Sequence, residues 1–223
     1  MSTPAQTDYF TGKAIQLATV AALGGFLFGF DTAVINGTVS AIEAQFEMSP
    51  GLLGFTVSSA LLGCIAGAYL AGRLADRIGR VRVMVIAAAL FFLSALGSGL
   101  AFGPADLIGW RVLGGLGVGA ASVIAPAYIA EIAPAPIRGR LGSLQQLAIV
   151  TGIFVALLSD AWLAAVAGGA TEELWFGLEA WRWMFIVEVV PAFAYGGLAL
   201  TIPESPRFLV ANGEERDARG VLR

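Results

Sequence analysis

Six long apolar stretches dominate the sequence, and they restrict this chain to a fold built inside a lipid bilayer. The stretches cover residues 15–38, 52–72, 83–103, 107–133, 141–166 and 183–202. A helix that crosses the hydrocarbon core needs about 20 consecutive, mainly apolar residues. The strands of a membrane barrel would instead alternate apolar and polar residues over about 10 positions. The stretches therefore predict an all-α membrane protein with six transmembrane helices.

The composition agrees with this class and excludes several kinds of function. Only 13% of the 223 residues are charged, whereas a soluble domain carries about 25%. No block of basic residues indicates binding to nucleic acid. The sequence has no histidine, so a histidine metal site is excluded and proton chemistry must use carboxylates. We expect no metal, no organic cofactor and no enzymatic activity.

The basic residues indicate how the helices are oriented. Most of the 13 lie before the first stretch, between the second and third, between the fourth and fifth, and after the sixth. Lysine and arginine are enriched in cytoplasmic loops of membrane proteins. The pattern predicts a cytoplasmic N-terminus over 1–14, a six-helix bundle over 15–202 and the start of a second cytoplasmic segment over 203–223. Both termini are then cytoplasmic.

Ionisable side chains inside the stretches are costly and mark candidate functional sites. Asp31 lies in the first stretch, and Arg111 and Glu131 lie near the two ends of the fourth. An Asp31–Arg111 pair can act as a proton switch, because protonation of Asp31 would free Arg111. The alternative is a static ion pair that fixes the register of two helices. Glu188, at the start of the sixth stretch, has no assigned role.

Polar and aromatic residues in the stretches are candidates for binding a sugar. Gln145 and Gln146 carry amides, which both donate and accept hydrogen bonds, as sugar hydroxyls do. The alternative is a hydrogen bond between helices. Phe28 lies one turn from Asp31 and can offer an apolar face to a sugar ring, although a core aromatic is the default interpretation.

Small residues predict where helices approach closely. Gly63 and Gly67 lie four residues apart in the second stretch, as do Gly115 and Gly119 in the fourth. This spacing places both glycines on one helix face, where they let backbones come into contact.

Three charged segments are expected at the cytoplasmic face. The first segment, residues 72–82, combines an aspartate and four arginines with two glycines that permit a tight link between helices. The second, residues 126–140, contains the prolines expected to end the fourth helix. The third, residues 203–209, follows the sixth helix. A plain cytoplasmic anchor is the alternative for the first segment. Because exposed ion pairs contribute only about 0–1 kcal/mol each, we expect a breakable gate. Its expected residues are Gly72, Arg73, Asp76, Arg77, Gly79, Arg80, Glu131, Arg138, Glu204 and Arg207.

Four motifs in this order resemble the N-terminal half of the sugar porter family in the major facilitator superfamily. The first is the nonapeptide Gly72–Arg80, and the second is Arg111 with the glycines that follow it. The third is the pattern P-x-Y-x-x-E-x-x-P-x-x-x-R-G, which begins at Pro126. The fourth is Pro203–Leu209, which matches P-E-S-P-R-[WF]-L.

The resemblance implies a function and assigns roles to residues. It implies transport of a hexose, pentose or polyol across the plasma membrane by proton symport with alternating access. Gln146 and Phe28 would contact the sugar, Asp31 and Arg111 would couple the proton, and the charged segments would form the inner gate. Proton symporters of the family carry an acid where Asp31 stands.

The chain departs from the family in having six spans instead of twelve. Such transporters bind substrate between two halves, so we expect a second six-helix bundle as a partner, either a C-terminal half or a second copy of this chain, in addition to the lipid bilayer. The chain ends at Arg223, within the segment that should lead onward. The alternatives are a truncated fragment without transport activity, and a uniporter in which Asp31 is structural.

Overall fold

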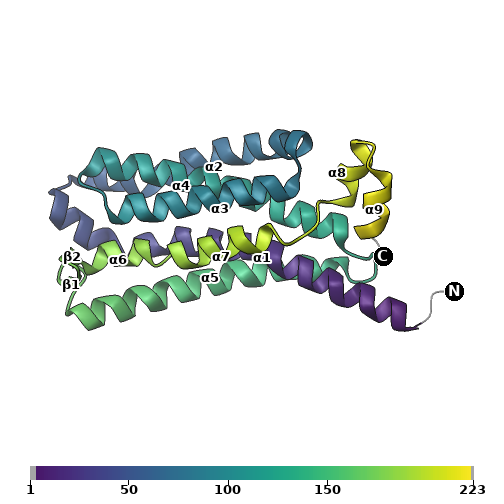
Figure 1. The fold of residues 1–223 in the computed structure, drawn as a ribbon. Helices are drawn as coiled ribbons and strands as arrows, with labels where there is room; N and C mark the ends of the chain where they lie inside the picture. The colour runs from purple at the N-terminus through teal and green to yellow at the C-terminus, as the bar shows by residue number, and fades with distance from the viewer. Residues whose placement is uncertain (1–3, 222–223) are drawn as a thin grey trace.

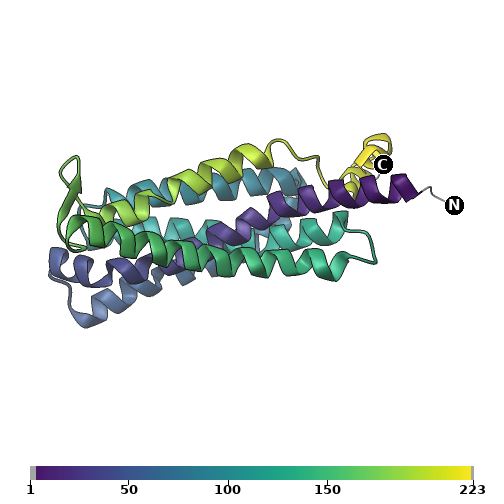
Figure 2. The ribbon, with the colours of Figure 1, turned by 90° about the horizontal axis from the view of Figure 1, so that it is seen from below.

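The computed structural model describes residues 4–221 as an elongated bundle whose long helices run along one axis (Figures 1 and 2). Five of these helices contain stretches long and apolar enough to cross a membrane. They are α1 (Pro4–Phe46), α2 (Pro50–Ile78), α3 (Arg80–Gly99), α4 (Pro104–Ile132) and α5 (Arg138–Ala167). Each of these five helices covers all or most of one stretch that was predicted from the sequence, and most of the helices are longer than that stretch.

The sixth crossing consists of two short helices, α6 (Ala180–Ile186) and α7 (Val189–Ala199), so the prediction of one continuous helix over 183–202 was wrong in this respect. Pro191 explains the break. It has no N–H, and its ring conflicts with the carbonyl four residues earlier, at Val187. The backbone tightens there, since the N–H of Glu188 donates to the carbonyl of Phe185 at 3.1 Å.

A small β-hairpin, which the sequence analysis did not predict, joins α5 to α6 at one end of the bundle (Figure 1). Strands β1 (Glu173–Trp175) and β2 (Leu178–Glu179) pair antiparallel. The turn residues Phe176 and Gly177 have φ values of 57° and 71°, as a two-residue type I′ turn requires. We call this end of the bundle the hairpin end.

Both described chain ends lie at the other end, which we call the terminal end (Figure 1). Here α1 begins, and α8 (Pro206–Ala211) and α9 (Glu215–Val221) follow the sixth crossing. Gly79 alone separates α2 from α3, with φ 96°. The link between the second and third helices, expected over residues 72–82, was therefore too long, because α2 continues through Ile78 and includes Gly72. Likewise Pro126 lies within α4, which ends at Ile132.

Helices α2 and α4 are in backbone contact through the four glycines predicted for close packing. A Cβ atom at Gly63 or Gly67 would overlap carbonyl oxygens of α4, and one at Gly115 or Gly119 would overlap carbonyl oxygens of α2. This close approach holds Arg111, which is on α4, at a fixed depth relative to α2.

Helix α1 is the central helix, whereas α2 and α5 are peripheral. In the most apolar window of each helix, 72% of the residues of α1 are buried, against 22% for α2 and for α5. The exposed residues of α2 and α5 include large apolar side chains such as Ile65, Tyr69, Phe154 and Leu158. These faces are suited to lipid or to another apolar surface.

Candidate functional site

The bundle buries an ion pair between α1 and α4. Arg111 Nη1 donates to Asp31 Oδ1 at 2.9 Å, and Nη2 donates to the main-chain oxygen of Asp31 at 3.2 Å. Both side chains are 2% exposed. Gly114 leaves room for this contact, because a Cβ there would lie 3.2 Å from Asp31 Oδ1. Each charge needs the other, since an unpaired charge at this depth is strongly destabilising.

A third ionisable group, Glu188, faces the same pair from the break between α6 and α7. It is 1% exposed, and neither of its carboxylate oxygens has a hydrogen-bond partner within residues 4–221. Its charge interacts with Asp31 and with Arg111. Two carboxylates thus face one guanidinium. Both carboxylates therefore depend on the same guanidinium for a counter-charge.

The ion pair borders a cavity of about 350 Å³ between α1, α2 and α4. Phe28, Asp31 and Arg111 all line it. Most of the other lining residues are apolar, and Thr32, Asn36 and Ser58 add polar groups. Cavities of this size accommodate small ligands and typically combine an apolar lining with a few polar groups. The cavity therefore joins a candidate ligand site to a candidate proton site.

The two predicted glutamines lie apart from this cavity and differ from each other. Gln145 is 8% exposed and packs against Gly25 of α1, and its Oε1 has no hydrogen-bond partner in the described chain. Gln146 lies on the exposed face of α5. The structure brings Phe28 together with Asp31 and Arg111, but neither glutamine lines that cavity.

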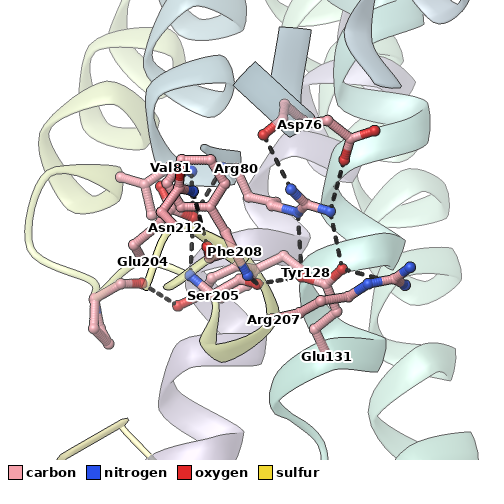
Figure 3. Close-up of polar contacts among 12 residues, drawn as sticks. Asp76, Arg80, Val81, Tyr128, Glu131, Glu204, Ser205, Arg207, Phe208 and Asn212 are labelled. Carbon is pink, nitrogen blue, oxygen red and sulfur yellow. Dashed lines mark hydrogen bonds and ion pairs between the residues drawn. The ribbon is translucent and has the colours of Figure 1, made fainter. Parts of the chain in front are cut away.

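A second polar site lies at the terminal end, where α2, α3, α4 and α8 meet (Figure 3). We call it the charged cluster. It consists of Asp76, Arg80, Glu131, Glu204, Ser205 and Arg207.

Arg80 is the central cation of the charged cluster. Its guanidinium contacts Glu131 on α4, at 3.2 Å from Nε to Oε2, and Asp76 on α2, at 3.1 Å. It also donates to the carbonyl of Ala75 at 3.0 Å, near the C-terminal end of α2. The Arg80 side chain is only 10% exposed, whereas Asp76 is 74% exposed. The Glu131 contact is therefore the better shielded of the two.

Glu204 binds the N-terminus of α3. Its carboxylate accepts from the backbone N–H groups of Arg80 at 2.8 Å and Val81 at 3.1 Å, and from its neighbour Ser205 at 2.8 Å. The first N–H groups of a helix have no partner within the helix and carry a partial positive charge. Gly79 is required here, since a Cβ would collide with the Glu204 carboxylate.

Ser205 and Tyr128 are functional contacts that the gate prediction did not include. The Ser205 hydroxyl donates to Glu131 and also accepts from the N–H of Phe208, which caps α8. The Tyr128 hydroxyl donates to the carbonyl of Pro203 at 2.8 Å. Both residues lie inside motifs recognised in the sequence, so the motifs themselves carried the signal.

Several expected gate residues do not join the charged cluster. Gly72 has open space around it. Arg73 lies over the ring of a tyrosine on its own helix, at 4.1 Å, and Arg77 forms no ion pair within the described residues. Arg138 donates to the carbonyl of Ala133 at 3.4 Å and does not pair with a carboxylate there. Arg207 does belong to the charged cluster, but only at its edge, because it is 79% exposed and reaches Glu131 at 4.0 Å.

One buried acid was missed altogether. Asp160 is 3% exposed on α5, at the hairpin end, and lies within the predicted span 141–166. A carboxylate inside an apolar stretch is the signal that identified Asp31, and it applied equally here.

Comparison with known proteins identifies the family. A family model described as "Sugar (and other) transporter" matches residues 17–223. The chain belongs to this sugar transporter family, whose members are transporters and not enzymes. It is 58% identical over 222 residues to a "Glucose transport protein" of Synechocystis sp., a match that covers 99% of this chain and 47% of that protein. It is 40% identical to the "D-xylose-proton symporter" of Escherichia coli, covering 97% of this chain and 49% of that protein.

Comparison with solved structures supports the same family. The major facilitator superfamily proton:xylose symporter XylE bound to 6-bromo-6-deoxy-D-glucose superposes with a TM-score of 0.88 at 40% identity, over 95% of this chain and 49% of that one. The fold is therefore that of the N-terminal half of this superfamily, as the resemblance predicted. The chain spans about half the length of the relatives it matches, and it is a multi-pass membrane protein.

Proposed function

We propose that this bundle is one half of a proton-coupled sugar transporter and that it supplies both the proton site and part of the sugar site. The observation that carries the proposal is the buried Asp31–Arg111 pair at the wall of a cavity that Phe28 also lines. Relatives named as proton symporters for D-xylose and for arabinose support it. Either a hexose or a pentose is the expected substrate.

The coupling step follows from the charges around Arg111. While Asp31 is ionised, it holds the guanidinium by accepting two hydrogen bonds from Arg111, one at its carboxylate and one at its main-chain oxygen. A proton on Asp31 removes the charge-assisted bond and leaves Arg111 to the nearby carboxylate of Glu188. Arg111 thus has two alternative anionic partners, one on α1 and one at the break between α6 and α7, and protonation decides between them. A change in helix packing at the cavity is the expected consequence.

The sugar contacts are divided between this bundle and its partner. Phe28 offers an apolar ring face in the cavity, and Gln146 offers an amide on the exposed face of α5. Gln145, with an unpaired amide oxygen beside α1, is the second amide candidate. A second six-helix bundle that covers the exposed faces of α2 and α5 would close the site, as is general for transporters that bind substrate between repeats.

The charged cluster is proposed to be a gate on the cytoplasmic side. The terminal end carries most of the basic residues, which orients it toward the cytoplasm of a plasma membrane. Its pairs to Asp76 and Arg207 are largely exposed, and pairs of this kind contribute only about 0–1 kcal/mol. They can therefore break and re-form at each turnover without unfolding the bundle.

The test is sugar uptake into proteoliposomes, with and without an inward proton gradient. The chain is measured alone and joined to the remaining half of the Escherichia coli D-xylose–proton symporter. In an active form, D31N should abolish accumulation against a gradient while exchange of sugar persists. The matched control is E43Q, which neutralises an exposed acid on the same helix.

The outcomes separate the alternatives. Accumulation that survives in D31N would contradict the coupling role and favour a uniporter with a structural Asp31. If folded protein shows no uptake alone but does so when joined to the second half, the isolated chain is inactive and the missing bundle is required. Uptake by the chain alone would favour assembly of two copies.

A further inference from the structure

Helices α1 and α5 run side by side in the same direction, and a row of small residues on α1 lets them touch. Gly25, Gly29, Ala33 and Gly37 repeat at four-residue spacing and are all buried or half-buried. A Cβ at Gly29 would overlap a carbonyl oxygen of α5. A Cβ at Gly37 would lie 2.6 Å from Oδ2 of Asp160. The Asp160 carboxyl therefore occupies the space that the missing side chain of Gly37 leaves.

Asp160 has none of the partners expected of a buried anion. It is 3% exposed, neither Oδ1 nor Oδ2 forms a hydrogen bond to any described group, and Oδ2 faces the backbone of Gly37. The ion pairs within residues 12–221 do not include it. Ionisable groups on the elements that pack against α5 are exposed or otherwise engaged: Glu43 of α1, Glu173 of β1, Arg111 of α4 and Arg182 of α6.

Asp31 provides the contrast within the same chain. It is equally buried, but Arg111 neutralises it at 2.9 Å. An ionised Asp160 would be an uncompensated charge between two helices, which is far less favourable than the neutral acid at the same place. The neutral acid also carries an O–H that can donate to a nearby carbonyl, whereas the carboxylate can only accept.

We propose that Asp160 is a second proton-binding site, distinct from Asp31, and that its protonated form allows α1 and α5 to pack at Gly37. The proposal concerns the folded bundle itself and does not require that the chain transports a sugar. Loss of this proton would drive water or a counter-charge into the interface, or separate the two helices at the hairpin end.

The sign of the pH effect follows from proton binding. In the unfolded chain an aspartate loses its proton near pH 3.9, whereas the proposal requires folded Asp160 to keep its proton to a higher pH. The folded state therefore binds more protons than the unfolded state, and stability falls as the pH rises. One proton corresponds to a change of up to about tenfold in the unfolding constant for each pH unit.

The experiment compares the full wild-type chain with D160N in detergent by thermal unfolding between pH 5 and pH 9. Asparagine has nearly the shape of the protonated acid but cannot ionise. We expect wild type and D160N to be similarly stable at the acidic end, and wild type to become progressively less stable than D160N as the pH rises. The matched control is D106N, at the half-buried Asp106 on α4, which should not alter the pH dependence.

Infrared spectroscopy provides a second readout that does not depend on unfolding. At neutral pH the carbonyl stretch of protonated carboxylic acids should lose the contribution of Asp160 in D160N, whereas D31N should keep that contribution. Parallel pH dependences for wild type and D160N, together with no loss of this band in D160N, would overturn the proposal. Failure of sugar uptake would leave both measurements unaffected, so the two proposals can fail separately.

Discussion

Two glycines on α2 offer a direct measure of how closely the helices pack. Gly67 faces α4, and a Cβ there would overlap the carbonyl oxygen of Leu116 and lie 2.9 Å from its carbonyl carbon. Gly72 is on the same helix, and a Cβ there would have no atom within 4 Å. We predict that G67A destabilises the bundle, whereas G72A leaves it unchanged or stabilises it.

The magnitudes follow from two opposing effects. Replacing glycine by alanine within a helix stabilises by about 0.8–1 kcal/mol through backbone entropy and helix propensity. This gain applies at both positions. At Gly67 the added methyl must push two backbones apart, and overpacking typically costs about 1–3 kcal/mol. The two variants should therefore differ by about 1–3 kcal/mol, which corresponds to roughly 2–12 °C in Tm for a domain of this size.

The assay is thermal unfolding of purified protein in one detergent, with both variants measured against wild type. G72A serves as the matched control, because the substitution and the helix are the same and only the neighbouring helix differs. Equal stability of G67A and G72A would refute the claim that α2 and α4 meet backbone to backbone at this position.

Two further predictions concern the ends of the bundle. E204Q should destabilise the protein by about 1–2 kcal/mol, because it weakens charged hydrogen bonds to the N-terminus of α3. The control D76N, which changes an exposed acid, should cost under about 1 kcal/mol. Equal losses of Tm in the two variants would contradict the capping role of Glu204. In the hairpin, burial raises the pKa of Glu179, but hydrogen bonds from its own backbone and from Arg182 outweigh it, so the pKa lies below its usual value. Folded Glu179 thus binds fewer protons than the unfolded chain, and its contribution is present at neutral pH and lost on acidification below about pH 4. The Tm difference between wild type and E179Q should shrink as the pH falls, and a constant difference would contradict this account.

Much of the architecture was predictable, because lipid imposes simple requirements on a chain. Length and apolarity alone located all six crossings, and the spacing of Gly63, Gly67, Gly115 and Gly119 predicted a contact that the structure confirms. The break in the sixth crossing at Glu188 was harder to predict from the sequence. Its cause, Pro191, is visible in the sequence, but a proline alone does not decide whether a helix breaks, since Pro126 lies inside the continuous helix α4.

The candidate site was predictable in its parts and less so in its arrangement. Asp31 and Arg111 were singled out because a charge in an apolar stretch must have a partner, and the structure places them 2.9 Å apart. The same reasoning should have included Asp160. The separation of Gln146 from the cavity depends on which face of α5 meets α1, and neighbouring residues on a helix point in different directions.

The sequence by itself determined the class of the protein, its six crossings, its family and the residues whose charge is out of place in lipid. These properties follow from the local free energy of transfer into a bilayer and from motifs that lie within single segments. Only the tertiary structure decided which charges meet. It placed Arg80 between Asp76 and Glu131, directed Glu204 to the start of α3, and gave Asp160 no hydrogen-bond partner among the described residues. Such contacts depend on helix rotation and depth, which are fixed by packing between segments distant in the chain.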